Sequence, residues 1–308
     1  MMRFGALLGL SLLLTLMAGA HADDLLNRPT DRTYDLVVDS GYLKVGVYQN
    51  FPPFSFEQDG RPAGVDVDIG RAIAQAMGVE FRVHWIVADE SLSDDLRNNV
   101  WKGHYLDKTR VADVMMRVPY DKDFAYMRDS VGEMVNGEVV LFGPYQQEHW
   151  AIAYDGTQID SVPTMAIFQY HPIGVELDTL PAIYLTSGLR GRLRDHVHHF
   201  HTVDQAFDAM ASGEVEAVMA MRSEVDYQVS RRSEQPLKLA ATGFPGIGKQ
   251  QWDVGMAVKS SHRQLGYKIE AIVDGMVRSG EMKTIFDRYG LRYSMPGFYD
   301  EILGASRD

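Results

Sequence analysis

The chain has 308 residues, no cysteine, and a formal net charge of -12 from 30 basic and 42 acidic side chains. This acidic balance argues against nucleic acid or an anionic membrane as the partner, and it suits a soluble protein that meets a basic partner surface. Without cysteine no disulfide can form, so the hydrophobic core alone must hold the fold, and the length predicts about two domains.

The first 22 residues have the pattern of a secretory signal peptide. Arg3 is the only formal charge before Asp23, an apolar run follows it, and Ala20-His21-Ala22 comes directly before Asp23. This is a charged start, an apolar segment and an A-x-A cleavage site. The apolar run is shorter than the ~20 residues of a membrane-spanning helix, so we expect export without a membrane anchor.

The first part of the exported chain predicts a strand–helix–strand unit. Its expected elements, in order, are strand 43–48, helix 67–77 and strand 79–87. The helix carries apolar residues on one face at a spacing of four, and Gly78 lies just beyond its end. Asp66 is placed to cap its N-terminus. Elements in this order indicate a parallel α/β sheet.

The same pattern returns in the second half of the chain. The expected elements are strands 173–177, 217–221 and 254–258, and helices 180–189, 203–211, 265–277 and 282–289. Two α/β units with a late return segment indicate two lobes between which the chain crosses twice. After a lead-in over 23–41, we expect lobe one at 42–150 plus 253–308 and lobe two at 151–252.

Six short motifs occur in a fixed order along most of the chain. They are Leu43-Lys44-Val45-Gly46-Val47, Pro52-Pro53-Phe54-Ser55-Phe56, Gly64-Val65-Asp66-Val67-Asp68, Phe142-Gly143-Pro144-Tyr145, Ser212-Gly213-Glu214-Val215-Glu216-Ala217-Val218, and Gly280-Glu281-Met282 with Tyr289-Gly290-Leu291. In this order they resemble the periplasmic solute-binding proteins of family 3, the amino-acid-binding type. The resemblance implies a two-lobe α/β periplasmic binding protein fold, with a two-strand hinge and a ligand cleft between the lobes.

The chain departs from that family where an amino-acid ligand is held. Family members place an arginine after a Ser/Thr-rich loop to bind the ligand carboxylate, whereas residues 115–123 here lack the Thr-Pro-x-Arg sequence. Met221, followed by Arg222, stands near the family's aspartate for the ligand ammonium. Asp178-Thr179 replaces its Gly-Thr loop. We therefore expect no amino-acid binding.

The candidate residues of the cleft come from both halves of the chain. They are Phe51, Phe54, Arg117, Thr179, Met221 and Arg222. Phe51 and Phe54 follow the first strand, and open α/β sheets place ligands at the carboxyl ends of strands. Packing within lobe one is the alternative for both, and it is favoured for Phe54. Arg117 either points into the cleft or is a solvated loop charge.

An insertion narrows the expected function. Residues 94–106 and 112–121 interrupt the family pattern, and the segment 94–153 resembles the MoxJ/XoxJ-type proteins, which are encoded with PQQ-dependent quinoprotein (methanol) dehydrogenases. The resemblance implies a periplasmic accessory protein that binds such a dehydrogenase or assists its maturation or activation. Trp101, Tyr105 and Tyr120 are the expected partner contacts, because aromatic residues anchor interfaces. Packing of the insertion onto lobe one is the alternative for all three.

Other functions are weighed against this one. The alternative is a transport receptor for a small non-amino-acid solute, with a cleft of Phe51, Met116, Met221 and one arginine. An enzyme on this fold, such as a dehydratase, is not predicted, because no catalytic motif is found. No cofactor is expected. The histidines between His196 and His201 could hold a metal ion on an extended strand, but a surface histidine run is favoured and no metal site is predicted.

Overall fold

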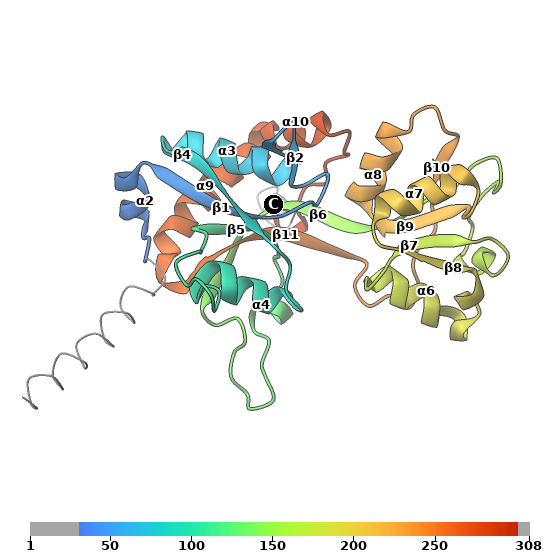
Figure 1. The fold of residues 1–308 in the computed structure, drawn as a ribbon, viewed down its shortest axis with the longest axis horizontal. Helices are drawn as coiled ribbons and strands as arrows, with labels where there is room; N and C mark the ends of the chain where they lie inside the picture. Colours follow the sequence, from blue (N-terminus) through green and yellow to red (C-terminus); the bar gives the residue numbers. More distant parts are fainter. Residues whose placement is uncertain (1–30, 301–308) are drawn as a thin grey trace, which may run out of the picture.

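The computed structural model describes residues 31–300 of the chain, and the predicted signal peptide lies outside them. Two lobes stand side by side, each built from strands with helices on both sides (Figure 1). We call the half that contains β1 lobe one and the half that contains β7 lobe two. Within the described part of the chain, none of the helices has the length and apolarity needed to span a membrane.

Lobe one is formed by an early segment and a late one. The early elements are α2 (Tyr34–Ser40), β1 (Tyr42–Tyr48), β2 (Phe56–Gln58), β3 (Arg61–Ala63), α3 (Val65–Met77), β4 (Glu80–Ile86), α4 (Leu92–Leu96), η1 (Arg97–Trp101), β5 (Val114–Pro119) and α5 (Lys122–Ala125). The late elements are β11 (Gln251–Lys259), η4 (Ser260–His262), α9 (Arg263–Ser279) and α10 (Glu281–Arg288).

Lobe two is formed by the segment between them, which the long strand β6 (Val139–Asp155) enters. Its further elements are η2 (Met165–Gln169), β7 (Ile173–Glu176), α6 (Leu180–Gly191), η3 (Arg194–His196), β8 (Val197–Phe200), α7 (Val203–Ser212), β9 (Ala217–Met221), α8 (Arg222–Arg231) and β10 (Leu237–Leu239). The predicted strands and helices are confirmed, with ends that differ by at most three residues. The last turn of α6 is irregular, because residues 188–190 leave the helical conformation.

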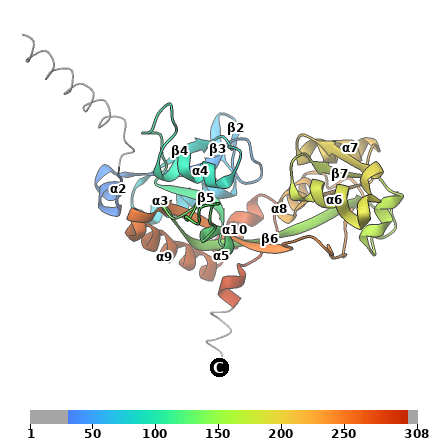
Figure 2. The same ribbon diagram turned by 90° about the horizontal axis from the view of Figure 1, so that it is seen from below.

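One sheet runs through both lobes in the order β4-β1-β5-β11-β6-β9-β7-β8, and β10 also pairs with β6. β6 is antiparallel to β11 from Val139 to His149 and antiparallel to β9 from Trp150 onward. β6 and the adjoining β11 therefore form the two-strand hinge, which Figure 2 shows as the bridge between the lobes. Within lobe one, β1 is parallel to β4 and β5, and β5 is antiparallel to β11. Within lobe two, β7 is parallel to β8 and β9, and β10 is antiparallel to β6.

Each lobe has its own hydrophobic core. In lobe one, β1 and β5 pack against the apolar faces of α3 and α9, as shown by buried side chains such as Val45, Ile73 and Ile269. In lobe two, two smaller clusters contain Phe168 and Phe207. Helices α9 and α3 repeat apolar residues every three or four positions, and this spacing presents one face to the sheet. The two cores let each lobe keep its shape while the hinge connects them.

The start of α3 differs from the sequence prediction. The helix begins at Val65 and its N-cap is Gly64, so the expectation that Asp66 caps it is wrong. Gly64 has a φ of 120°, and a Cβ there would lie 2.2 Å from the carbonyl oxygen of Phe54. Only glycine permits this close approach of the two backbones. Asp66 consequently lies inside the first turn, buried, where it faces the hinge region rather than the helix end.

Candidate functional site

β5 carries one arginine to the junction of the two lobes. Arg117 has a φ of 59°, an uncommon conformation for a residue with a side chain. Its side chain is 6% exposed. A guanidinium that is removed from water needs charged and polar partners, because an unpaired buried charge is very unfavourable. The partners of Arg117 therefore define the chemistry of this junction.

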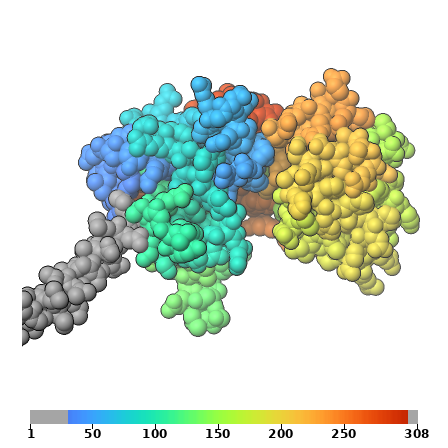
Figure 3. All heavy atoms as spheres, viewed as in Figure 1, coloured from blue at the N-terminus to red at the C-terminus, as the bar shows by residue number. Residues whose placement is uncertain are grey.

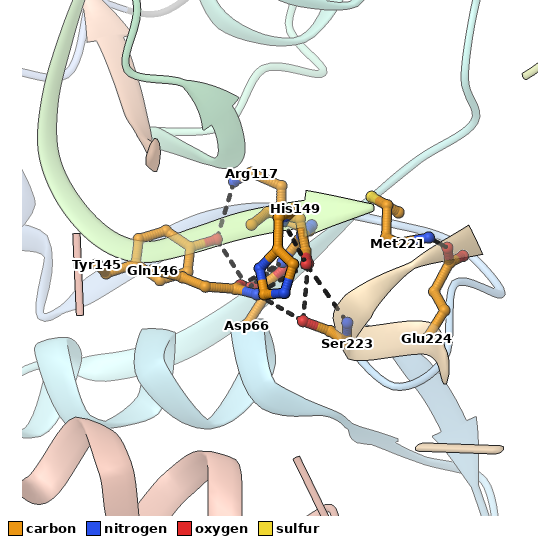
Figure 4. Close-up of polar contacts among 9 residues, drawn as sticks. Asp66, Arg117, Tyr145, Gln146, His149, Met221, Ser223 and Glu224 are labelled. Carbon is orange, nitrogen blue, oxygen red and sulfur yellow. Dashed lines mark hydrogen bonds and ion pairs between the residues drawn. The ribbon is translucent and has the colours of Figure 1, made fainter. Parts of the chain in front are cut away.

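Arg117 contacts two carboxylates and an aromatic ring, and Figure 4 shows it beside Asp66 and Gln146. Its Nη1 lies 3.8 Å from Asp66 Oδ1, and its Nη2 lies 3.8 Å from Glu148 Oε2. Nη1 also donates a hydrogen bond of 3.1 Å to Gln146 Oε1. The guanidinium carbon lies 3.4 Å from the centre of the Phe54 ring, a cation–π contact. Arg117 is thus paired inside the protein and is not a solvated loop charge.

The same cluster joins β6 to lobe two. Glu148 accepts hydrogen bonds from Ser223 Oγ at 2.7 Å and from Gln146 Nε2 at 2.9 Å. Gln146 Nε2 also donates to Ser223 Oγ at 2.6 Å. Because Ser223 lies in the first turn of α8, these bonds connect the hinge strand to a helix of lobe two. The network is continuous from Asp66 in α3 to Ser223 in α8.

Acidic groups outnumber the arginine at this junction. Burial raises the pKa of Asp66 to about 6, against the attraction of Arg117 and the hydrogen bond of 2.8 Å that Tyr145 donates. Asp66 Oδ2 is buried with no hydrogen-bond partner among residues 31–300. The pKa of Glu224 is raised to about 8, first by burial and then by the charges of Glu176 and Glu148. One guanidinium is shared among several carboxyl groups.

Three cavities open between the lobes, and Figure 3 shows the hollow that they occupy. Their volumes are about 380, 210 and 290 Å³, and we call them together the cleft. The first two share the lining residues Phe51, Glu176, Val203 and Glu224. Trp150, on the hinge strand, lines the second and the third. The cavities thus follow one another across the face where the lobes meet.

The predicted cleft residues divide into three groups. Phe51, Thr179 and Met221 line the cavities, and Thr179 also caps α6 by accepting a hydrogen bond of 3.3 Å from Ala182 N. Phe54 and Arg117 lie in the buried cluster, where Phe54 is fully buried. Arg222 lies apart, because it bonds Asp226 at 2.7 Å and lines none of the three cavities.

The predicted partner contacts differ in exposure. Tyr105 is 77% exposed. Trp101 is partly buried and packs against a core cluster of lobe one that includes Ile86 and Leu96. Tyr120 is half-buried and packs edge-on against Phe298 with 5.5 Å between ring centres. Tyr105 therefore lies outward, whereas Trp101 and Tyr120 are partly packed against other side chains of lobe one, and the role of all three as partner contacts stays a prediction.

The histidine run lies on and beside β8, an edge strand of lobe two. His198 Nδ1 is 3.4 Å from Glu214 Oε1, and His201 is exposed. Over residues 31–300 no group of three or more metal-ligating side chains comes together.

Several cleft and cluster residues escaped the sequence analysis. They are Gln146, Glu148, Trp150, Glu176, Ser223 and Glu224. The sequence does contain a signal for Gln146 and Glu148, because the polar run Gln146-Gln147-Glu148 interrupts an otherwise apolar strand. Glu176 ends a parallel strand, the edge where ligands gather in α/β sheets. The distant partners of these residues are set by the tertiary fold, which no local pattern reports.

The fold and the cleft define a two-lobe binding protein. The family model of bacterial extracellular solute-binding proteins, family 3, matches residues 43–292. The chain belongs to this family, and the family-level resemblance drawn from its motifs is confirmed.

Known proteins resemble the chain at low identity. It is 22% identical over 253 residues to the probable ABC transporter arginine-binding protein ArtJ of Chlamydia trachomatis serovar D, covering 80% of this chain and 85% of that protein. It is 30% identical over 66 residues to the membrane-bound lytic murein transglycosylase F of Actinobacillus succinogenes, where the match spans 21% of this chain and only 14% of that protein. An ancestral cationic amino acid solute-binding protein of known structure has a TM-score of 0.65 and 16% identity, covering 83% of this chain and 98% of that one. This last likeness concerns the fold alone.

Proposed function

We propose that the chain is a periplasmic accessory protein that binds a PQQ-dependent quinoprotein alcohol (methanol) dehydrogenase and assists its maturation or activation. The proposal rests on two properties of the segment 94–153. Its sequence resembles the MoxJ/XoxJ-type proteins, and it presents apolar side chains to solvent on lobe one. The chain would act by binding, without a cofactor or catalytic group of its own.

A first part of the proposed docking surface is the loop after η1. Tyr105 and Leu106 are 77% and 74% exposed. Leu106 borders a cavity of about 310 Å³ that His84 and Trp85 also line. A cavity beside exposed apolar residues is suited to receive a side chain of a protein partner.

A second part is the loop 126–136, the green projection below lobe one in Figures 1 and 3. It folds back on itself, because Val135 N donates to Met127 O at 2.9 Å and the backbones of Arg128 and Met134 pair in an isolated antiparallel β-bridge. Its exposed apolar side chains are those of Tyr126, Met127, Val131, Met134 and Val135. Contiguous exposed apolar groups on a soluble protein are typical of interaction sites. We therefore include this loop in the docking surface.

The test is capture of the purified dehydrogenase from the same host. The variant Tyr105→Ala with Val131→Ser should weaken capture at least tenfold and leave the melting temperature unchanged, because both side chains are exposed. The matched control is Tyr170→Ala on lobe two, where a tyrosine is 79% exposed. The control should bind like the unmutated chain.

Two outcomes would count against the proposal. If the unmutated chain fails to capture the dehydrogenase over a range of salt concentrations, the accessory function is wrong. If capture is strong but unchanged in the double variant, the docking surface lies elsewhere and the assigned contacts are wrong.

A transport receptor for a small non-amino-acid solute is the second candidate, and the cleft favours it. Phe51 from lobe one and Glu176 and Met221 from lobe two line the same cavity, so a solute there would contact both lobes. Such contacts favour closure around the hinge. A screen of small solutes by thermal melting tests this function, and a rise of several degrees would support it. Capture of a permease complex, rather than the dehydrogenase, would then decide between the two functions.

A further inference from the structure

The cleft has acidic and aromatic parts in a continuous arrangement. Its first two cavities are lined by Glu176 and Glu224, and its last two by Trp150. Phe51 contributes a ring to the first two, and Trp252 packs against Trp150 with 4.7 Å between ring centres. An occupant of the middle cavity would therefore touch carboxylates and aromatic rings together.

The basic side chains near the cleft are already paired. Arg231, which lines the first cavity, lies 3.6 Å from Asp204, and Lys249, which lines the third, pairs with Asp121. Arg117 is held between Asp66 and Glu148 behind the cleft. In the described part of the chain, no unpaired basic side chain lines the three cavities.

The two glutamates, by contrast, have no basic partner. Among residues 31–300 neither Glu176 nor Glu224 forms an ion pair within 4 Å. Glu224 is 8% exposed, and its carboxylate accepts a hydrogen bond of 3.1 Å from the backbone N–H of Met221 (Figure 4). A buried carboxylate beside a second one is poorly solvated, so a bound cation would stabilise both.

We infer that the cleft binds a small organic ammonium ion with an apolar or aromatic body and no carboxylate. The ammonium would lie against Glu176 and Glu224, and the faces of Phe51 and Trp150 would surround its apolar part through cation–π and van der Waals contacts. A ligand carboxylate would be repelled by the two glutamates, and among the described residues no unpaired guanidinium lines the cleft to bind it. Anions and zwitterions are therefore disfavoured. The inference concerns the cleft between the lobes and is independent of the docking surface on lobe one.

The experiment uses titration calorimetry at pH 8 with a set of matched probes. Phenethylammonium carries the ring and the cation, phenylalanine adds a carboxylate to the same frame, and phenylacetate has the carboxylate alone. Tetramethylammonium reports the charge without the ring. We expect phenethylammonium to bind at least tenfold more tightly than phenylalanine, and phenylacetate to give no heat.

Variants of the two glutamates test whether the measured heat comes from binding in the cleft. Glu224→Gln and Glu176→Gln keep the shape of the side chains and should each weaken phenethylammonium binding at least tenfold. Glu234→Gln is the control, because Glu234 is exposed on lobe two and lines none of the cavities. Thermal melts verify that all three variants are folded.

Three results would overturn the inference. They are the absence of heat from both cations at millimolar concentration, equal binding by Glu224→Gln and the unmutated chain, and tighter binding of phenylalanine than of phenethylammonium. Dehydrogenase capture is measured separately with the lobe-one variants, so the failure of one proposal leaves the other intact.

Discussion

Arg117 illustrates how a buried charge constrains its neighbours. Its guanidinium lies 3.8 Å from both Asp66 and Glu148 and donates a hydrogen bond to Gln146 Oε1, while its backbone N–H donates to the Tyr145 hydroxyl. A buried ion pair contributes little net stability by itself, but removing one partner leaves the other charge unpaired in a poorly solvated place. Arg117 is therefore important to the fold, because it is the cation that Asp66 and Glu148 share.

Arg117→Met should lower the free energy of unfolding by about 3–5 kcal/mol, since Asp66 and Glu148 would lose their common cation. Urea unfolding at pH 7 measures the change. Lys283→Gln is the matched control, because Lys283 forms an exposed pair with Asp287 at 2.6 Å. It should cost less than ~1 kcal/mol. A loss below ~1 kcal/mol for Arg117→Met would contradict the assigned role.

Glu224 predicts a dependence of stability on pH. Its pKa rises from the ordinary 4.5 to about 8 in the folded chain, so the folded state binds this proton more tightly than the unfolded state. The free energy of unfolding should therefore fall as the pH increases from about 4.5 to about 8. Glu224→Gln removes this loss and should gain roughly 1–3 kcal/mol over the unmutated chain between pH 5 and pH 8. Urea unfolding at both pH values measures the change. The prediction is wrong if the two proteins differ in free energy of unfolding by the same amount at pH 5 and at pH 8.

At the scale of elements, α3 depends on a single glycine at its start. A Cβ at position 64 would lie 2.2 Å from the Phe54 carbonyl oxygen, which is a severe overlap. A Cβ at Gly78 would meet nothing within 4 Å. Gly64→Ala should therefore cost at least ~3 kcal/mol, from strain and overlap together. Gly78→Ala, also at positive φ, should cost only about 1 kcal/mol. Thermal and urea unfolding of the two variants gives the comparison, and equal losses would disprove the reasoning.

The elements could be predicted because their signals are local. The alternation in β1 and the spacing of apolar residues in α9 depend only on neighbours along the chain. The cap of α3 was predicted wrongly for a reason that is not local. Asp66 is a favourable capping residue, but the backbone of Phe54 approaches Gly64, and the helix starts two residues earlier than predicted.

The candidate site could be predicted only in part, because its chemistry comes from partners far apart in sequence. Phe51 was predicted from its place after the first strand, and Met221 from its place near the family's aspartate. Both line the cleft. The pairing of Arg117 with Glu148 joins β5 to β6, and no pattern within either strand shows it. Trp101 is an aromatic residue in an insertion, a position that fits an interface and a core equally well. In the structure Trp101 is partly buried against a core cluster that includes Leu96, and its role in an interface stays a prediction.

For the whole molecule, the arrangement of charge predicts poor binding of amino acids. Met221 stands near the position of the family's aspartate, and Arg117 is paired with two acids. Titration calorimetry with the twenty amino acids should give no measurable binding. A thermal melt of the same sample ensures that the protein is folded. Micromolar affinity for any amino acid would contradict this expectation and would favour an amino-acid receptor.

The pairing of β6 with β11 also has a meaning for how such a chain can be rearranged. His149 and Gln251 face each other across the two strands, so the chain departs for lobe two and comes back at adjacent points. A short reverse turn between these two residues would close lobe one without changing its sheet order. Lobe two is therefore inserted between two paired strands of lobe one. It could be deleted, or replaced by the second lobe of a related protein, at these two positions. Circular dichroism of the shortened chain would show whether lobe one folds without it.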